Sequence, residues 1–297
     1  MKLTLKMILG LGLAFLLVGG ILFTIAFAAS GFSFNKMTGT KYESRSYTET
    51  GLISSVSIDV GNSEVTLKYD KNAEKISVDY SECIKSNGKV ASSFSVTEAN
   101  GKLTITENTR WIYCLQLWST MNTKIVITVP EGRELSLDVD TDNGDVKVYG
   151  DAKFQSLNIE THNGDIDLDG NFTANDVNIE TNNGDIEIQK SLTVNTLTAE
   201  LDNGTFEVDG ALTVKTLTVE LDNGDIEAED GLITAQEIYF TTDNGDIEAN
   251  LFGKVTDYKI TVHTDNGKAN VQNSLTGERT LYIETHNGDA EITFANK

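Results

Sequence analysis

Polar and apolar residues alternate with period two through most of the second half of the chain. In the stretch 157–168, "LNIETHNGDIDL", Leu157 and Ile159 point to one side while Asn158 and Glu160 point to the other. The same alternation resumes after the Asn-Gly pair. Strict alternation of this kind indicates half-buried strands.

The alternating segments recur at a nearly fixed period. In the second half of the chain Asn-Gly occurs at 143, 163, 183, 203, 223, 244, 266 and 287, so the spacing is 20 to 22 residues. Glycine after asparagine supplies the positive φ that a sharp corner needs. A meander of β-hairpins would fit, with Asn-Gly as each turn, and so would a β-solenoid in which each period is one coil. Stacked coils need equal perimeters, and a repeated asparagine suits an internal ladder of amides. The sequence therefore predicts an all-β protein, a β-solenoid of about 20-residue coils with Asn-Gly corners.

The first half of the chain is less regular. Segments 56–67 and 94–105 show the same alternation around Asn62 and Asn100. We expect a membrane anchor at 1–29, a linker at 30–48, an irregular β cap with degenerate coils at 49–130, and regular solenoid repeats at 131–297. The aromatic stretch "WIYCLQLW" at 111–118 is predicted to close the first coil.

An uncharged apolar run of 23 residues occupies positions 7–29. A helix of that length spans a bilayer with some tilt, and Lys2 and Lys6 before it favour a cytoplasmic amino terminus. A cleaved signal peptide is the alternative, because Ala26, Phe27 and Ala28 match the small-residue cleavage pattern. The run predicts a transmembrane helix, and therefore a single-pass protein in the cell membrane with its carboxyl-terminal domain extracytoplasmic. Either alternative places the repeats outside the cytoplasm.

The net charge of −22 is concentrated in the repeats. Residues 131–297 hold 35 acidic and 10 basic side chains, whereas residues 1–130 hold 10 acidic and 13 basic ones. A surface this acidic repels nucleic acids and anionic lipids and attracts cations. Nucleic acid is therefore excluded as a partner, and cationic peptides or other surface proteins are the expected ones, beside the membrane that holds the helix.

The repeated "xNGDIxI" strands behind one apolar amino-terminal segment resemble the bacterial "putative adhesin" proteins with a DUF4097 β-solenoid domain. The resemblance covers residues 56–292 and is densest over 137–247. It implies an envelope protein of Gram-positive bacteria, often linked to envelope stress, and it carries over no catalytic residues.

Repeated carboxylates are the first candidates for chemistry. They form three ladders, which include Glu160, Glu180 and Glu220; Asp165, Asp185 and Asp225; and Asp167, Glu187 and Glu227. Oxygen ligands in stripes are candidates for weak calcium binding, although the favoured explanation is a solvated polar face that keeps a β protein soluble. We expect no other cofactor. A catalytic pair should stand out from a repeat, and none does, so the sequence predicts no enzyme.

Two cysteines, Cys83 and Cys114, lie in the irregular part. Outside the cytoplasm an even pair can form a disulfide, and two buried thiols are the alternative. The sequence thus predicts a non-enzymatic envelope protein whose acidic solenoid binds cationic partners. A passive scaffold or adhesin that acts through protein contacts or self-association is the second hypothesis.

Overall fold

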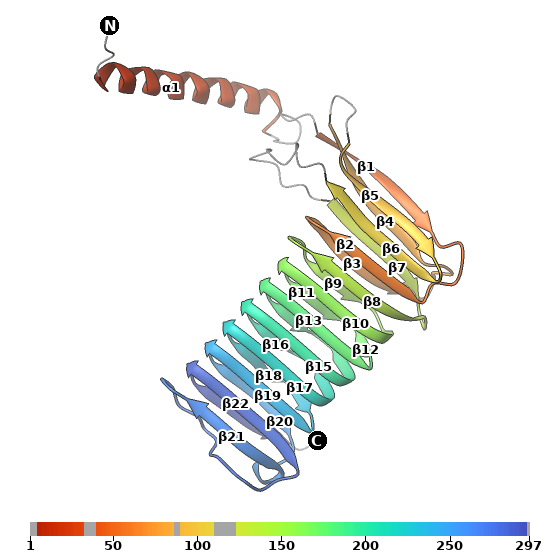
Figure 1. The fold of residues 1–297 in the computed structure, drawn as a ribbon, viewed down its shortest axis with the longest axis vertical. Coiled ribbons are helices and arrows are strands. Elements are labelled where there is room, and N and C mark those ends of the chain that lie inside the picture. Colours follow the sequence, from red (N-terminus) through yellow and green to blue (C-terminus); the bar gives the residue numbers. More distant parts are fainter. Residues whose placement is uncertain (1–4, 33–39, 86–89, 110–122, 296–297) are drawn as a thin grey trace. The chain divides into compact units, whose positions relative to one another are not determined.

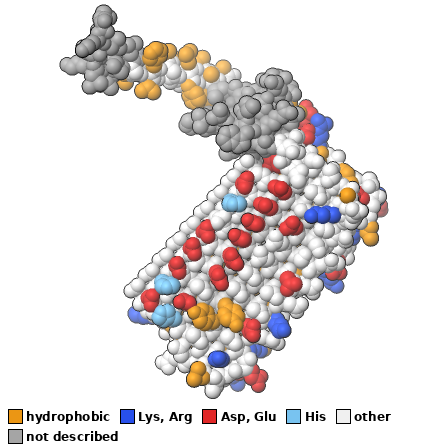
Figure 2. Space-filling model, in the orientation of Figure 1, with side chains coloured by type: hydrophobic (Ala, Val, Ile, Leu, Met, Phe, Trp, Pro, Cys, Tyr) orange, Lys and Arg blue, Asp and Glu red, His pale blue; other side chains and the backbone are white. Residues whose placement is uncertain are grey.

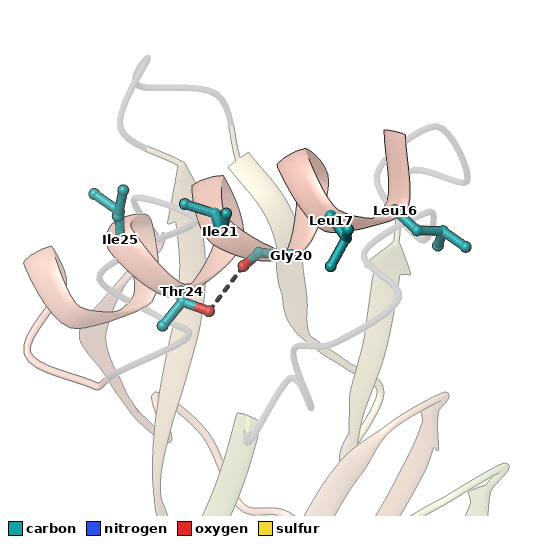
Figure 3. Close-up of a pocket in the computed structure, with 6 residues that line it drawn as sticks. All are labelled: Leu16, Leu17, Gly20, Ile21, Thr24 and Ile25. Atoms are coloured by element: carbon teal, nitrogen blue, oxygen red, sulfur yellow. Dashed lines mark hydrogen bonds between the residues drawn. The ribbon is translucent and has the colours of Figure 1, made fainter. Parts of the chain in front are cut away.

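The computed structural model describes residues 5–32, 40–85, 90–109 and 123–295. Two compact units are present, and helix α1 (Leu5–Ala29) belongs to the first. Its apolar side chains, such as Phe15 and Leu16, are exposed. Figure 3 shows one side of the helix, where Thr24 Oγ1 donates a hydrogen bond to the Gly20 carbonyl over 2.8 Å. In the part of the chain described, no helix has the length and apolarity required to cross a membrane. The membrane anchor at 1–29 therefore stays a prediction.

The second unit contains nearly all the strands, which stack as parallel coils (Figure 1). Its regular part runs through β10 (Ala152–Asn163), β11 (Ile166–Asp169), β12 (Asn171–Thr173), β13 (Asp176–Asn183), β14 (Ile186–Ile188), β15 (Ser191–Asn203), β16 (Phe206–Val208), β17 (Ala211–Asn223), β18 (Ile226–Thr234), β19 (Glu237–Asn244) and β20 (Ile247–Phe252). Each residue pairs with its equivalent one coil on: Ile159 with Ile179, for example, and Ala199 with Val219. Hairpins would have given antiparallel pairs within a repeat, so the predicted β-solenoid is confirmed.

Both ends of the stack depart from chain order. Strand β2 (Ser55–Val60) lies between β6 (Lys102–Thr109) and β8 (Glu134–Thr141), and β3 (Ser63–Asp70) lies between β7 (Thr123–Pro130) and β9 (Val146–Tyr149). At the other end, β22 (Arg279–Asn287) is inserted between β19 and β21 (Tyr258–Thr264), and β23 (Ala290–Ala295) pairs with β20. The first and last coils in sequence are thus internal, which gives their strands partners on both sides.

The outermost strand at the carboxyl-terminal end is covered by its own chain. Ile260 and Ser274 exchange both backbone hydrogen bonds at 2.9 Å, and the Val262 amide donates to Asn273 Oδ1. An exposed strand edge invites pairing with another molecule, so this loop protects the end of the stack.

The corner glycines are required by close approach of successive coils. A Cβ on Gly164 would lie 2.3 Å from the carbonyl oxygen of Gly144, and one on Gly184 would lie 2.1 Å from that of Gly164. Positive φ occurs at only two of these corners, Gly204 and Gly224. The expected left-handed conformation is therefore wrong for the other corners, since contact between coils excludes a side chain there.

The predicted amide ladder is present, but it lies at the surface rather than inside. Among the described residues nine asparagines form it through eight hydrogen bonds, in each of which Nδ2 of one asparagine donates to Oδ1 of its neighbour over 2.8 to 3.2 Å. In stack order they are Asn62, Asn143, Asn163, Asn183, Asn203, Asn223, Asn244, Asn287 and Asn266. Asn100 is not a member, because it sits with φ 52° in the turn between β5 (Val90–Ala99) and β6.

The segment 40–48, expected to be part of a linker, is strand β1 (Thr40–Thr48), which pairs with β4 (Ser77–Lys85). Tyr47 packs against the core, and its hydroxyl donates to Glu98 over 2.6 Å. Glu98 also accepts the backbone amides of Thr50 and Gly51 at 2.7 and 2.6 Å. These bonds lower the pKa of the Glu98 carboxyl to about 2. The chain leaving β1 is therefore fixed to the solenoid.

Candidate binding face

One outer face of the solenoid consists of the outward side chains of β2, β8, β10, β13, β15, β17, β19, β22 and β21. We call it the acidic face. Apolar side chains of the same strands are buried, as at Leu157 and Ile159, which are 1% and 0% exposed. Alternation therefore leaves the polar residues in columns that run along the stack. Figure 2 shows these rows of acidic side chains.

Six carboxylates in register form what we call the acidic column. Its members are Asp59, Asp140, Glu160, Glu180, Glu200 and Glu220, each the direct pairing partner of the next. Neighbouring strands lie about 4.8 Å apart, so like charges repel along its whole length. Burial, together with the charges of Glu160 and Glu200, raises the pKa of the Glu180 carboxyl, and burial with the charge of Glu160 raises that of Asp140. A cation placed on the column would relieve this repulsion.

A second row, the flanking column, lies two residues further along each strand. It contains Asp142, His162, Asn182, Asp202, Asp222, Asp243, His286 and Asp265. His286 Nδ1 lies 3.2 Å from Asp243 Oδ1, and Asn182 donates to Asp202 over 2.5 Å. The acidic and flanking columns border a furrow of about 190 Å³. It is lined by residues of β13, β15, β17 and β19, among them Glu180, Glu200, Glu220 and Asp243. The sequence ladders did not include this column, although the same period-two count would have found it.

The corner aspartates have a structural task. Oδ1 of Asp165 accepts the backbone amide of Asp185 over 3.0 Å, and Oδ1 of Asp185 accepts that of Thr205 over 2.8 Å. Asp225 accepts the amide of Asp246 in the same way, over 2.7 Å. Each carboxylate therefore binds the next coil to its own, which accounts for this ladder without a ligand.

The third ladder lies on another face, in strands β11, β14, β16, β18, β20 and β23. We call it the opposite column: Asp167, Glu187, Glu207, Glu227, Glu248 and Glu291. At its start Lys147 Nζ lies 3.0 Å from Asp167. Burial and the charge of Asp209 raise the pKa of Glu207. The structure thus brings the members of each ladder together, and it puts the Glu160 ladder and the Asp167 ladder on different faces.

Within the described ranges, no group of three or more histidine, cysteine, aspartate or glutamate side chains is arranged to hold a metal ion. Weak calcium binding at the predicted carboxylates stays a prediction. Cys83 is buried in strand β4, where its backbone lies opposite Ser92. Cys114 and the stretch 111–118 fall outside the described residues, so the disulfide and the aromatic cap also stay predictions.

An aromatic pair lies beside the line of the acidic column, in the coils that follow Glu220. Tyr239 of β19 and Tyr282 of β22 are pairing partners, with ring centroids 6.3 Å apart at 39°. They occupy the column that holds Thr198 and Thr218 in the preceding coils. Sequence reasoning missed this pair, since the two residues that the inserted β22 makes neighbours lie 43 positions apart in the chain.

A comparison with known protein families shows the family to which this chain belongs. The family model described as Toastrack DUF4097 matches residues 53–297, which is most of the chain. The chain belongs to this family. The resemblance inferred from the repeats is confirmed, and the Toastrack match covers both the irregular first coils and the regular ones.

Solved structures share the Toastrack fold at low sequence identity. A "putative adhesin" from Parabacteroides merdae is 10% identical with a TM-score of 0.53, over 85% of this chain and 96% of that one. A "putative lipid binding protein" from Parabacteroides distasonis is 17% identical with a TM-score of 0.50, over 86% of this chain and 95% of that one. A search of curated proteins finds no match. At these identities the likeness concerns the fold alone.

Proposed function

We propose that this chain is a non-enzymatic protein of the cell envelope that holds cationic partners on its acidic face. The observation that carries the proposal is the unbroken register of six carboxylates from Asp59 to Glu220. Basic peptides are the partners that fit, because they bring several positive charges on one flexible molecule.

The electrostatics of the acidic face support binding of cationic partners. Like charges about 4.8 Å apart are unfavourable in the free protein, and they add to burial in raising the pKa values of Glu180 and Asp140. A cationic partner gains attraction and also removes this repulsion. The interaction is long-ranged at a solvated surface, so it should weaken as salt rises.

We propose binding rather than catalysis because the carboxylates belong to the repeat. An acid–base pair needs two groups with different environments at one place, whereas the acidic column offers equivalent groups in every coil. Membership of a family linked to envelope stress, as the sequence resemblance implies, agrees with a binding function.

We place the acidic face outside the cytoplasm on the strength of the apolar run at 7–29 and the lysines before it. Fractionation of cells that carry the full chain tests this placement. Recovery with the membrane, and digestion of the repeats by protease added to intact cells, are expected. Recovery in the cytosol would overturn it.

A scaffold or adhesin is the second candidate, favoured by the description of the Parabacteroides merdae neighbour as a putative adhesin. Self-association end to end is the less favoured form, because Ser274 and Asn273 already occupy the outer edge of β21. If this second candidate is correct, we expect the flat faces of the solenoid to contact the other protein or a second copy of the chain.

Titration of the full chain with a labelled cationic amphipathic peptide tests the main proposal. The protein is kept in an uncharged detergent, and an anionic peptide of equal length runs beside it. Saturable binding that weakens with salt, and that fails with the anionic peptide, is expected. The variant E160Q/E180Q/E200Q/E220Q should bind at least tenfold more weakly, because four of the six column charges are gone.

The matched control is E187Q/E207Q/E227Q/E248Q, which removes four charges from the opposite column. It changes the net charge equally, so equal weakening by both variants would mean diffuse attraction rather than a binding face. Absence of any binding by the unmodified chain would move the function to the scaffold or adhesin.

A further inference from the structure

We infer that the cationic partner lies along the acidic face as an α-helix, with one helical turn on each coil, and that an arginine near its end stacks on Tyr239 and Tyr282. This inference rests on the proposed function and specifies the partner's conformation and its anchor. Three features of the face carry it: the repeat distance of its charges, its width, and the aromatic pair beyond them.

The repeat distance favours a helix. Carboxylates of the acidic column recur with the strand spacing of about 4.8 Å, and an α-helix advances 5.4 Å per turn. Basic residues three or four apart then meet one carboxylate per turn. An extended peptide along the same line places same-side residues about 6.6 Å apart, which falls out of step within two coils.

The mismatch for a helix is small over the whole column. Six carboxylates from Asp59 to Glu220 span five strand spacings, about 24 Å, which corresponds to about 16 helical residues. The drift of about 0.6 Å per turn sums to about 3 Å, which the flexible stems of lysine and arginine absorb.

The width of the face also suits a helix. The acidic and flanking columns are two residues apart along the strands, or about 6.6 Å. Between them runs the furrow bordered by Glu200, Asp202, Glu220 and Asp222. A helix about 10–12 Å in diameter resting on this furrow brings basic side chains over both columns.

The tyrosine pair gives the partner a fixed end. Tyr239 and Tyr282 are half-buried and lie among polar outward residues. The Tyr282 hydroxyl donates to Glu284, and Glu237 lies two residues before Tyr239 on the same strand. A planar guanidinium can stack on the rings while it hydrogen-bonds to these carboxylates, which an ammonium cannot do equally well.

Two 20-residue peptides of identical composition test the conformation. Both carry one arginine near one end, and all their other basic residues are lysine. The first places its basic residues three or four apart, and the second places them at every other position. Fluorescence anisotropy with the full chain at physiological salt should show the first peptide binding about tenfold more tightly. Circular dichroism of the mixture should show its helix content rising.

The variant Y239T/Y282T tests the anchor. Threonine occupies this column in the neighbouring coils, so the substitution keeps a residue that the fold already accepts, and the melting temperature checks it. Binding of the arginine-bearing helix should fall about three- to tenfold. A helical peptide with lysine in place of the arginine should bind the variant and the unmodified chain alike.

Equal binding of the two peptides, or no gain of helix, would overturn the helical partner while leaving cation capture in place. Equal weakening of the arginine and lysine peptides by Y239T/Y282T would overturn the guanidinium anchor. Binding of neither peptide would overturn the proposed function itself, and with it this inference.

Discussion

The side-chain amide of Asn183 donates to Oδ1 of Asn163 over 2.9 Å and accepts from Asn203 over 2.9 Å. The Asn183 amide also donates to the His162 carbonyl over 3.4 Å, so its side chain bonds the preceding coil twice. The ladder therefore fixes the register of the stack from outside the core. Replacement of one member should interrupt two rungs at once.

Asn183→Ala should lower the free energy of unfolding by about 1–2 kcal/mol, because both rungs and the longer bond to the His162 carbonyl are lost at an exposed site. Urea denaturation followed by circular dichroism measures it. Asn175→Ala, exposed and outside the ladder, is the control and should change the stability by under about 0.5 kcal/mol. Equal effects of the two substitutions would show that the ladder contributes no stability of its own.

Gly184→Ala should destabilise the solenoid by about 2–3 kcal/mol or more. Its Cβ would lie 2.1 Å from the Gly164 carbonyl oxygen, so adjacent coils would have to separate. Gly61→Ala is the matched control, since its Cβ would meet its nearest atom, Asp142 Oδ2, at an ordinary 3.5 Å. Thermal melting compares the two variants. A normal melting temperature for Gly184→Ala would contradict contact between coils as the reason for glycine.

Glu98→Gln should reduce the loss of stability in acid. The folded state holds the pKa of Glu98 at about 2, below its ordinary value of 4.5, through the Thr50 and Gly51 amides and the Tyr47 hydroxyl. Its stabilising contribution is therefore present above pH 4.5 and disappears as the pH falls toward 2. Melting temperatures between pH 2 and 5 should fall less steeply in the variant. Identical slopes would show that other carboxylates dominate acid unfolding.

Glu180→Gln should raise the melting temperature at pH 7 while it weakens peptide binding. The pKa of Glu180 is raised by burial and by the charges of Glu160 and Glu200, so the folded state binds its proton more tightly than the unfolded chain does. That contribution favours folding at low pH and is lost as the pH rises through the folded pKa. The unmodified chain should therefore gain stability as the pH falls from 7 toward 5, and the variant should gain less.

The control for this experiment is Asn178→Ala, which lies two residues before Glu180 on β13 and whose side-chain amide donates to Asn158 rather than to a carboxylate. It should leave the pH dependence of the melting temperature unchanged. If Glu180→Gln lowered stability at pH 7, the repulsion along the acidic column would be too weak to matter, and the case for a cation on the column would lose its electrostatic support.

The sequence alone determined the coil, because everything within one coil is local. Alternation decided that Ile159 points inward and Glu160 outward, and the recurring Asn-Gly marked each corner. Equal repeat length implied that residues 20 positions apart would pair, as Glu160 and Glu180 do. Family membership followed from the same repeat.

Only the tertiary structure decided the order of coils at the two ends. The insertion of β2 between β6 and β8, and of β22 between β19 and β21, consists of pairings between segments far apart in the chain. Spacing along the sequence contains no such information. The tyrosine pair exists because of that insertion, and the true reason for the corner glycines is a contact between coils. Both are relations between segments distant in the chain, which local patterns do not encode.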